Sequence, residues 1–216
     1  MKTPFTTGQF LGIFESYNNT VFPAQFFFIL AGTVCLILLL KAKIYANLLT
    51  SIFHILLWAW TGIVYHILFF SEINKPAYIF GGLFILQSLF LAYESFISKR
   101  IIYEAPAGSK KIIPLILVLT GLFIYPMISF LMKGEAVLTI TPGLPCPGII
   151  ISFGLLLFTE KRIPRYLFII PCLWALLGIS AAINFGIIQD FLLPVAALIS
   201  ILCLIRRRRI TSEVLV

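Results

Sequence analysis

Polar and aromatic side chains that can bind a solute or carry a proton form a stripe along the apolar segment 44-70. At about 100° per residue in an α-helix, they fall within about 40° of one line: Asn47, Ser51, His54, Trp58, Thr61 and Tyr65. Such a stripe cannot face lipid, which offers no hydrogen-bonding partner. His54 lies near mid-bilayer, about 15 Å from the inner end at 1.5 Å per residue. The stripe predicts a polar pathway or, alternatively, hydrogen bonds between helices.

Two further apolar segments, 77-98 and 166-184, carry side chains that can complete this pathway. Gln87 and Glu94 share one face of the first segment, and Gln87 lies at nearly the depth of His54. We therefore predict a substrate pathway through three segments, lined by His54, Trp58, Thr61, Tyr65, Gln87, Glu94, Trp174 and Asn184. The alternative interpretation is that these groups only hold the helices together.

A stretch rich in proline and glycine, TPGLPCPG at 141-148, is the second notable feature. Its three prolines and two glycines exclude a regular helix, and broken backbone at membrane depth requires protein or a cavity around it. Cys146 and His66 can converge there with Glu72 and Asp190 as a metal site, although their spacing matches no metal motif. The alternative is a rigid outer loop.

Several enzyme classes lack their motifs in this chain. It contains no GxxxxGK[ST], HExxH or GxSxG, so phosphate-loop, zincin and serine-hydrolase chemistry have no support. The segment 187-205 has no lysine, so a retinal Schiff base is not available. The sequence leans away from an enzyme without deciding the point, and it indicates no cofactor.

Composition defines the elements that must position these residues. Of the 216 residues, 61% are hydrophobic and 11% charged, whereas a soluble domain carries about 25% charged residues. A membrane-crossing helix needs about 20 mostly apolar residues. The sequence therefore predicts an all-α, polytopic membrane protein, a single domain over 1-216. It has seven spans, or six if the fifth only dips into the membrane: 21-40, 44-70, 77-98, 112-132, 141-159, 166-184 and 187-205.

Basic residues give the orientation. With the N-terminus outside, 13 of the 16 fall on the inner side, which satisfies the positive-inside rule. Residues 1-20 are then an outer interfacial segment and 206-216 a cytoplasmic tail. We predict a cell inner (plasma) membrane protein whose charge of +8 contacts lipid headgroups and not nucleic acid. The inner-side set comprises Lys41, Lys43, Lys99, Arg100, Lys110, Lys111, Lys161, Arg162, Arg165 and Arg206 to Arg209, and the outer-side set Lys2, Lys75 and Lys133.

A weak internal similarity suggests a duplicated membrane unit. LWAWTGI at 57-63 resembles LWALLGI at 173-179, and Phe69 and Phe185 share the same offset of 116 residues. The layout is then three spans, one linking span and three spans in a parallel repeat. Some transporters are built in this way, with their binding site between the copies near the midplane.

The chain also resembles a family of small bacterial multi-span membrane proteins of unknown function, sometimes labelled permeases. The resemblance is carried by WAWTGIVYHILFFSEIN at 58-74, GLPCPGIIISFGLLL at 143-157, PFTTGQFLGIFESYN at 4-18 and IIQD at 187-190. It covers nearly the whole chain. It implies the multi-span architecture and no catalytic residues.

These features together favour a transporter or permease for a small solute or ion, with the polar pathway lined by the second, third and sixth spans. The first alternative is a membrane redox or metal-binding protein centred on the Pro-Cys-Pro loop at 145-147. The second is a non-catalytic scaffold or sensor subunit. Its partners would be the lipid bilayer and an unidentified solute, and a homo-oligomer is compatible with the sequence.

Overall fold

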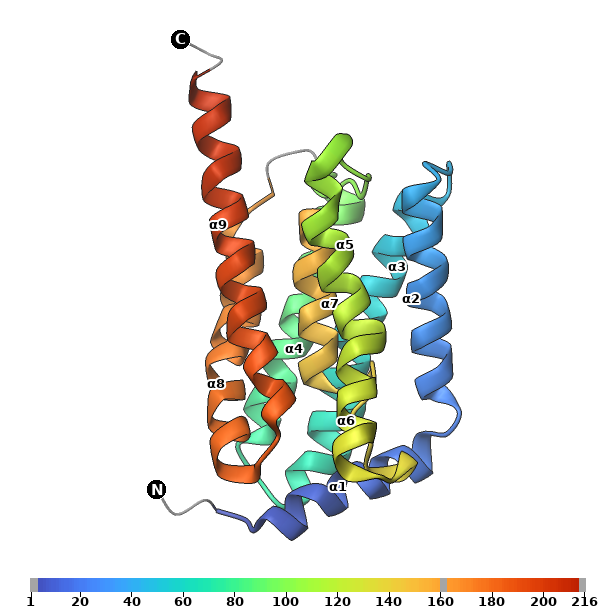
Figure 1. Cartoon of the computed structure of the whole chain (residues 1–216), viewed down its shortest axis with the longest axis vertical. Coiled ribbons are helices and arrows are strands. Elements are labelled where there is room, and N and C mark those ends of the chain that lie inside the picture. Colours follow the sequence, from blue (N-terminus) through green and yellow to red (C-terminus); the bar gives the residue numbers. More distant parts are fainter. Residues whose placement is uncertain (1–3, 160–162, 214–216) are drawn as a thin grey trace.

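The computed structural model describes residues 4–159 and 163–213, with side chains to residue 206. Within these residues the regular elements are helices, which run alongside one another in a bundle (Figure 1). Lys2, Lys161 and Arg162 and the side chains of Arg207 to Arg209, all used above to predict orientation, lie outside the described residues.

Five helical segments are long and apolar enough to cross a membrane: Ala46–Glu72, Ala77–Ile97, Gly108–Lys133, Arg165–Phe185 and Ile188–Arg206. Their bounds coincide with five of the predicted spans, and their length and composition are compatible with crossing a membrane. Each is assembled from consecutive elements: α3 (Ala46–Trp60), η1 (Thr61–Phe69) and η2 (Phe70–Glu72); α4 (Ala77–Ala92) and η3 (Tyr93–Ile97); η4 (Gly108–Lys111), α5 (Ile112–Leu119), η5 (Thr120–Ile124) and α6 (Tyr125–Lys133); η7 (Arg165–Phe168) and α8 (Ile169–Phe185); η8 (Ile188–Phe191) and α9 (Leu192–Glu213).

The N-terminal part is a bent pair of helices. α1 (Thr7–Val21) and α2 (Ala24–Leu40) meet at an angle of 79°, so that α2 runs along the bundle and α1 lies across one end of it (Figure 1). A capping box between Thr6 and Gln9 starts α1. If the bent pair is one span, the described chain has up to six. The end crossed by α1 is called the α1 end below.

The predicted fifth span, 141-159, is shorter than predicted. Its helix, α7 (Pro145–Leu157), has 13 residues, about 20 Å at 1.5 Å per residue, whereas the hydrocarbon core is about 30 Å thick. The seven-span count therefore stays a prediction, as do the repeat and the orientation in the membrane. A second short helix, η6 (Ala136–Leu138), precedes α7 at the α1 end.

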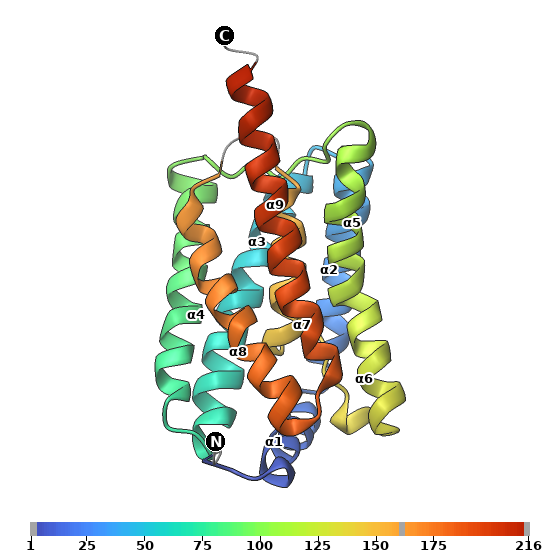
Figure 2. The ribbon, with the colours of Figure 1, turned by 60° about the vertical axis from the view of Figure 1, so that its left-hand side comes forward.

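α7 lies in the middle of the bundle. It packs against α3, α5, α8 and α9, and both views show it surrounded by longer helices (Figures 1 and 2). Glycines bring α5 and η5 close to it: a Cβ on Gly121 would lie 2.6 Å from the Pro147 carbonyl oxygen, and one on Gly154 would lie 2.9 Å from that of Pro114. Such small-residue contacts allow close helix packing in membranes.

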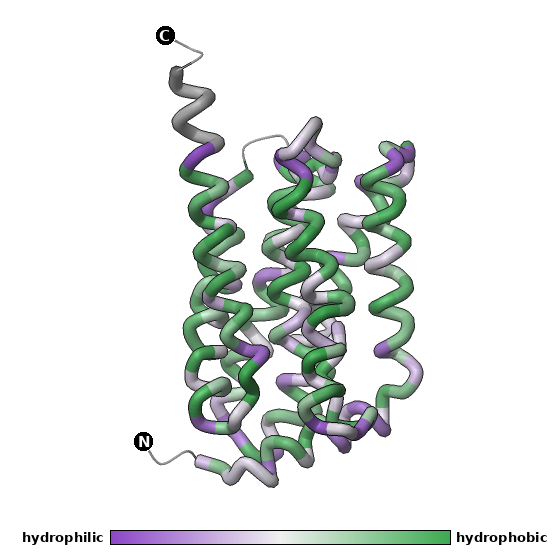
Figure 3. Tube along the Cα trace, viewed as in Figure 1, coloured by the Kyte–Doolittle hydropathy of each residue, from purple (hydrophilic) through white to green (hydrophobic). Residues whose placement is uncertain are grey.

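The outer surface of the bundle is apolar along its length. Leu30, Ile79, Leu131 and Leu176 each expose more than 60% of their surface, and hydrophobic residues cover the long sides while hydrophilic ones gather at the two ends (Figure 3). Such an expanse of exposed apolar surface is unfavourable in water and suits a bilayer. The fold is therefore that of a helical protein compatible with membrane spanning.

Candidate functional site

The predicted polar stripe of segment 44-70 points into the bundle, where hydrogen bonds pair its central members. His54 Nδ1 lies 2.7 Å from the Tyr103 hydroxyl and Nε2 lies 2.6 Å from Ser152 Oγ, while the Trp58 indole donates to the same Ser152 oxygen at 3.0 Å. All four side chains are buried. We call these residues the His54 cluster; it joins α3, α7 and the loop after η3.

The first residue of the stripe, at the end opposite α1, holds a loop in place. The Asn47 side-chain carbonyl accepts a hydrogen bond from the Tyr103 backbone N–H at 2.8 Å. Tyr103 is fully buried, and this burial raises the pKa of its hydroxyl far above the usual value. Because the phenol stays neutral, it can keep its hydrogen bond to His54. The cluster is thus saturated by protein groups and leaves no free atom on His54 for a solute.

Gln87 and Glu94 are also bound by neighbouring helices. The Gln87 amide donates to the Leu167 carbonyl at 2.9 Å. The buried Glu94 carboxylate accepts hydrogen bonds from Arg100, Ser98 and Tyr166. The hydrogen bond to Glu94 raises the pKa of the Arg100 guanidinium further. Glu94 thus forms an ion pair with Arg100 of the following loop, and its hydrogen bond from Tyr166 fastens η3 to η7 at the end opposite α1. Its predicted role on a pathway stays a prediction.

A cavity of about 170 Å³ lies in the α1-end half of the bundle. It brings together two predicted pathway residues, Tyr65 and Trp174, with Cys146 and Asp190. The other predicted pathway residues do not line it: His54, Trp58, Thr61, Gln87, Glu94 and Asn184. Asn184 is exposed and donates a hydrogen bond to the Ser180 carbonyl at 2.9 Å. The pathway predicted as one continuous line is therefore divided into a part bonded mainly by protein groups, in which Gln87 Oε1 has no partner among the described residues, and a part beside a void.

Asp190 is the residue that the predicted pathway missed. It is 1% exposed, accepts a hydrogen bond from the Tyr125 hydroxyl and lies beside the Cys146 thiol. The available signal was its position, because it is the single charge in the 40-residue apolar stretch 166-205. An ionisable residue at such depth marks a functional site by default, since burying it is costly.

The prolines explain how Cys146 reaches this cavity. Pro145 and Pro147 occupy the first turn of α7, where a missing backbone N–H breaks no helical hydrogen bond. Gly143, just before the helix, has φ +103° and touches its neighbours so closely that a Cβ would lie 2.8 Å from the Tyr17 hydroxyl. The prediction that the whole stretch 141-148 excludes a regular helix is wrong, because its second half, from Pro145 on, forms the first turn of α7. The break covers 141-144 and is followed by a helix in the interior with its N-terminus at the cavity.

His66 lies close to the cavity but does not complete a metal site. Its ring is buried between Phe84 and Trp174, with centroids 4.7 and 4.8 Å away, and its two nitrogens have no hydrogen-bonding partner among the described residues. The described part of the chain contains no group of three or more His, Cys, Asp or Glu side chains able to hold a metal ion. The metal site at Cys146 and His66 stays a prediction that this arrangement does not support.

α1 covers the cavity from its end of the bundle. The rings of Phe5, which precedes α1, and of Phe10 in α1 pack on Phe185 with centroids 5.2 and 4.5 Å away, and both also pack on Phe70. Farther along α1, Tyr17 and Asn18 are hydrogen-bonded to Trp60 and to the Val137 and Thr139 carbonyls. One half of α1 is therefore anchored by hydrogen bonds, whereas the half over the cavity rests on aromatic contacts.

A second cavity offers no comparable chemistry. A groove of about 660 Å³ between α2 and α3 is lined almost wholly by apolar side chains, including Phe27, Leu56 and Ile63. It lacks a charged group to orient a polar solute. The cavity at Asp190 is therefore the candidate functional site.

The fold and the site together define a helical protein with membrane-compatible spans and an aromatic cavity next to a buried carboxylate. The chain belongs to the family described as "Family of unknown function (DUF6064)", which it matches over residues 7–214. This confirms the resemblance to a family of unknown function inferred from the sequence. No curated protein and no solved structure matches the chain.

Proposed function

We propose that this protein is a transporter of the plasma membrane that takes a small solute into the cavity at Asp190. The observation that carries the proposal is the combination of an aromatic cavity with a buried carboxylate in a membrane-compatible bundle. Binding sites of this kind combine apolar walls with a few placed polar groups. The metal and redox alternative lacks such an observation.

The size of the cavity limits the solute. Its volume is about 170 Å³, and an engineered apolar cavity of about 150 Å³ holds one benzene molecule. A solute of roughly that size fits without displacing protein. This volume favours compact organic molecules over larger sugars.

The interrupted helix at the cavity supports transport over simple binding. Transporters commonly place their site at the midplane, where a discontinuous helix exposes its end to the substrate. α7 begins at Pro145 inside the bundle and directs its N-terminus to this cavity. Beyond the cavity, the His54 cluster and the pair Glu94–Arg100 close the opposite end, so solute reaching Asp190 would require a second conformation to leave there.

Transport is tested with purified protein in proteoliposomes. A thermal-shift screen of small amines, alcohols, organic anions and sugars first identifies a ligand, because binding to the folded state raises stability by about 2.7 kcal/mol at hundredfold excess over Kd. Uptake of that ligand is then measured. Stabilisation together with uptake supports a transporter. Stabilisation without uptake overturns transport and favours a sensor or scaffold.

A paired substitution on α8 tests whether the cavity is the site. Ala181 lines the cavity, so Ala181→Phe fills it and is expected to lower ligand affinity by about tenfold or more. Ile183 on the same helix is 68% exposed on the outer surface, and Ile183→Phe adds a ring there without loss of affinity. Equal affinity in both variants would place the site elsewhere.

A further inference from the structure

The charges around the cavity have one sign. None of the described side chains that line it is Lys, Arg or His, and Asp190 is its one carboxylate. The titratable groups around Asp190 are Tyr125, Cys146 and Tyr65, which are neutral at pH 7 in their reference states. Among the described residues, the ion pair between Arg100 and Glu94 lies at the end opposite α1. A solute entering the cavity therefore meets a carboxylate without a basic counterpart.

A buried carboxylate in this setting favours a cationic partner. Burying a charge is costly unless it is paired and hydrogen-bonded. Tyr125 supplies a hydrogen bond to one oxygen, Oδ1, but it supplies no positive charge. The Cys146 thiol in the N-terminal turn of α7 is a second hydrogen-bonding neighbour of Asp190, and the positive charge that this turn adds is only the partial charge of a helix end. A bound cation would complete the pairing, whereas an anion would be repelled.

The walls of the cavity suit a cation as well. Trp174, Tyr65, Phe70, Phe80 and Phe185 surround it, and aromatic faces attract cations through their quadrupole. The attraction is stronger where water is excluded. Trp174 is held in place by edge-to-face contacts with Phe80 and Phe84 at centroid distances of 5.3 and 5.0 Å, so its ring is fixed before a ligand arrives.

We propose that the solute of this cavity is a small organic cation, whose ammonium group binds between the Asp190 carboxylate and the faces of Trp174 and Tyr65. This inference rests on the proposed function, since it names the substrate class for the same cavity. It follows from the juxtaposition of a void, one carboxylate and aromatic walls. Neutral solutes of the same shape would gain binding energy from contacts with the aromatic walls but not from Asp190.

The test compares cations with neutral molecules of the same shape. Binding to the purified full chain in nanodiscs is measured by calorimetry for choline against 3,3-dimethylbutan-1-ol and for benzylamine against benzyl alcohol. Each pair differs in charge while the size is nearly constant. We expect at least one cation to bind about tenfold or more tightly than its neutral partner.

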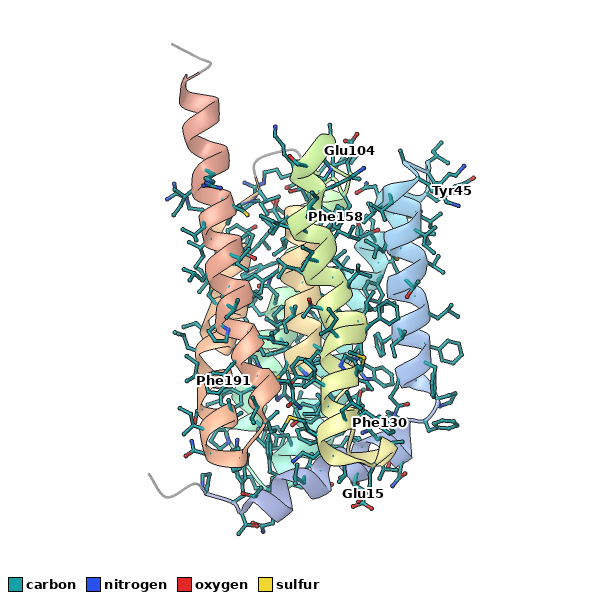
Figure 4. The ribbon with its side chains drawn as sticks, in the orientation of Figure 1. Glu15, Tyr45, Glu104, Phe130, Phe158 and Phe191 are labelled. Atoms are coloured by element: carbon teal, nitrogen blue, oxygen red, sulfur yellow. The ribbon has the colours of Figure 1, made fainter. Side chains whose placement is uncertain are left out.

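Variants assign the preference to Asp190. Asp190→Asn keeps the shape of the side chain. It is expected to abolish the preference for the cation and to leave the affinity for the neutral partner unchanged. Glu15→Gln is the matched control, because Glu15 is an exposed acid at the same end that points away from the bundle (Figure 4). Trp174→Leu removes an aromatic face but no charge, and it is expected to weaken binding of the cation more than binding of its neutral partner. This variant keeps the test decisive if Asp190→Asn fails to fold.

Each outcome decides between the two proposals. Preference for the cation that is lost in Asp190→Asn and retained in Glu15→Gln supports the inference. The proposal of a cationic solute is overturned if the neutral partners bind as well as the cations, or if the preference persists in Asp190→Asn. The proposal of a solute-binding cavity then still stands. If no member of either pair binds and the broader screen yields a neutral or anionic ligand, the inference is wrong and the proposed function stands. If nothing in the screen binds, both are wrong.

Discussion

The two ends of this bundle use buried polar groups in opposite ways. In the half opposite α1, Tyr103 and Ser152 each pair with His54, and Glu94 pairs with Arg100. In the α1-end half, Asp190 is hydrogen-bonded to Tyr125 and Cys146, faces a void and has no counter-charge among the described side chains that line it, and the His66 nitrogens have no partner among the described residues. The comparison teaches that buried polarity by itself does not identify a site. A buried polar group identifies a site when it is incompletely paired and lies next to a cavity.

The largest expected effect separates the two histidines. His54→Ala leaves Tyr103 and Ser152 without their shared partner, and an unsatisfied buried group costs about 1–3 kcal/mol. We expect the free energy of unfolding to fall by about 3 kcal/mol once the lost packing is included, with the ligand affinity of the remaining folded protein unchanged. Denaturant titration in detergent measures the first, and calorimetry the second.

The matched variant is His66→Phe. Because its ring lies among aromatic side chains and its nitrogens are unpaired, replacing it by an apolar ring is expected to change stability by less than about 1 kcal/mol. A loss as large as that of His54→Ala would mean that His66 has a partner in the membrane, and the contrast between the two ends would be wrong.

A smaller effect is expected at the carboxylate. Tyr125→Phe removes the hydrogen bond to Asp190, and a hydrogen bond to a charged group contributes about 1.5–3 kcal/mol. We expect stability to fall by about 2 kcal/mol, and the stabilisation by a cationic ligand to rise, because the carboxylate then depends more on its ligand. Thermal shifts with and without choline measure both. A smaller ligand shift in Tyr125→Phe would indicate that the hydroxyl binds the ligand itself.

The last effect, a change in access to the cavity and not in the fold, is expected at the covering helix. Phe10→Leu keeps an apolar side chain but removes the aromatic contacts to Phe70 and Phe185, worth about 0.5–1.5 kcal/mol each. In a background in which Cys35, Cys172 and Cys203 are replaced by Ser, we expect Cys146 to react with a maleimide several-fold faster. Leu11→Ile on the same helix is the control. Equal rates in both would show that α1 does not limit access to the cavity.

The sequence predicted much of this architecture because lipid imposes a length and a polarity on each span. The segments 77-98 and 166-184 agree with Ala77–Ile97 and Arg165–Phe185 to within a residue. The sequence separated an interfacial segment 1-20 from a span beginning at 21 and left open that the fifth segment only dips into the membrane. The 79° angle of the bend and the 13-residue length of α7 were not predicted, since both depend on what the neighbouring helices provide. A segment of 13 apolar residues in the interior has the same composition as part of a full span.

The site was harder to predict than the fold. Periodicity identified the inward face of segment 44-70 and therefore found Tyr65 as well as His54. It cannot tell which of them meets a partner and which meets a void, because the partners Tyr103 and Ser152 come from distant segments. Asp190 was visible as an isolated charge, but its contact with Tyr125 joins residues 65 positions apart, and no local pattern encodes that.

The shortness of α7 also constrains how the protein is made. A segment of about 20 Å is too short to be held in a bilayer by its own hydrophobicity, and α9, against which it packs, is synthesised after it. α3 and α5 are available to α7 as soon as it is made, whereas its contacts with α8 and α9 can form only after these helices have been synthesised. The packing around the centre of the molecule is therefore completed last.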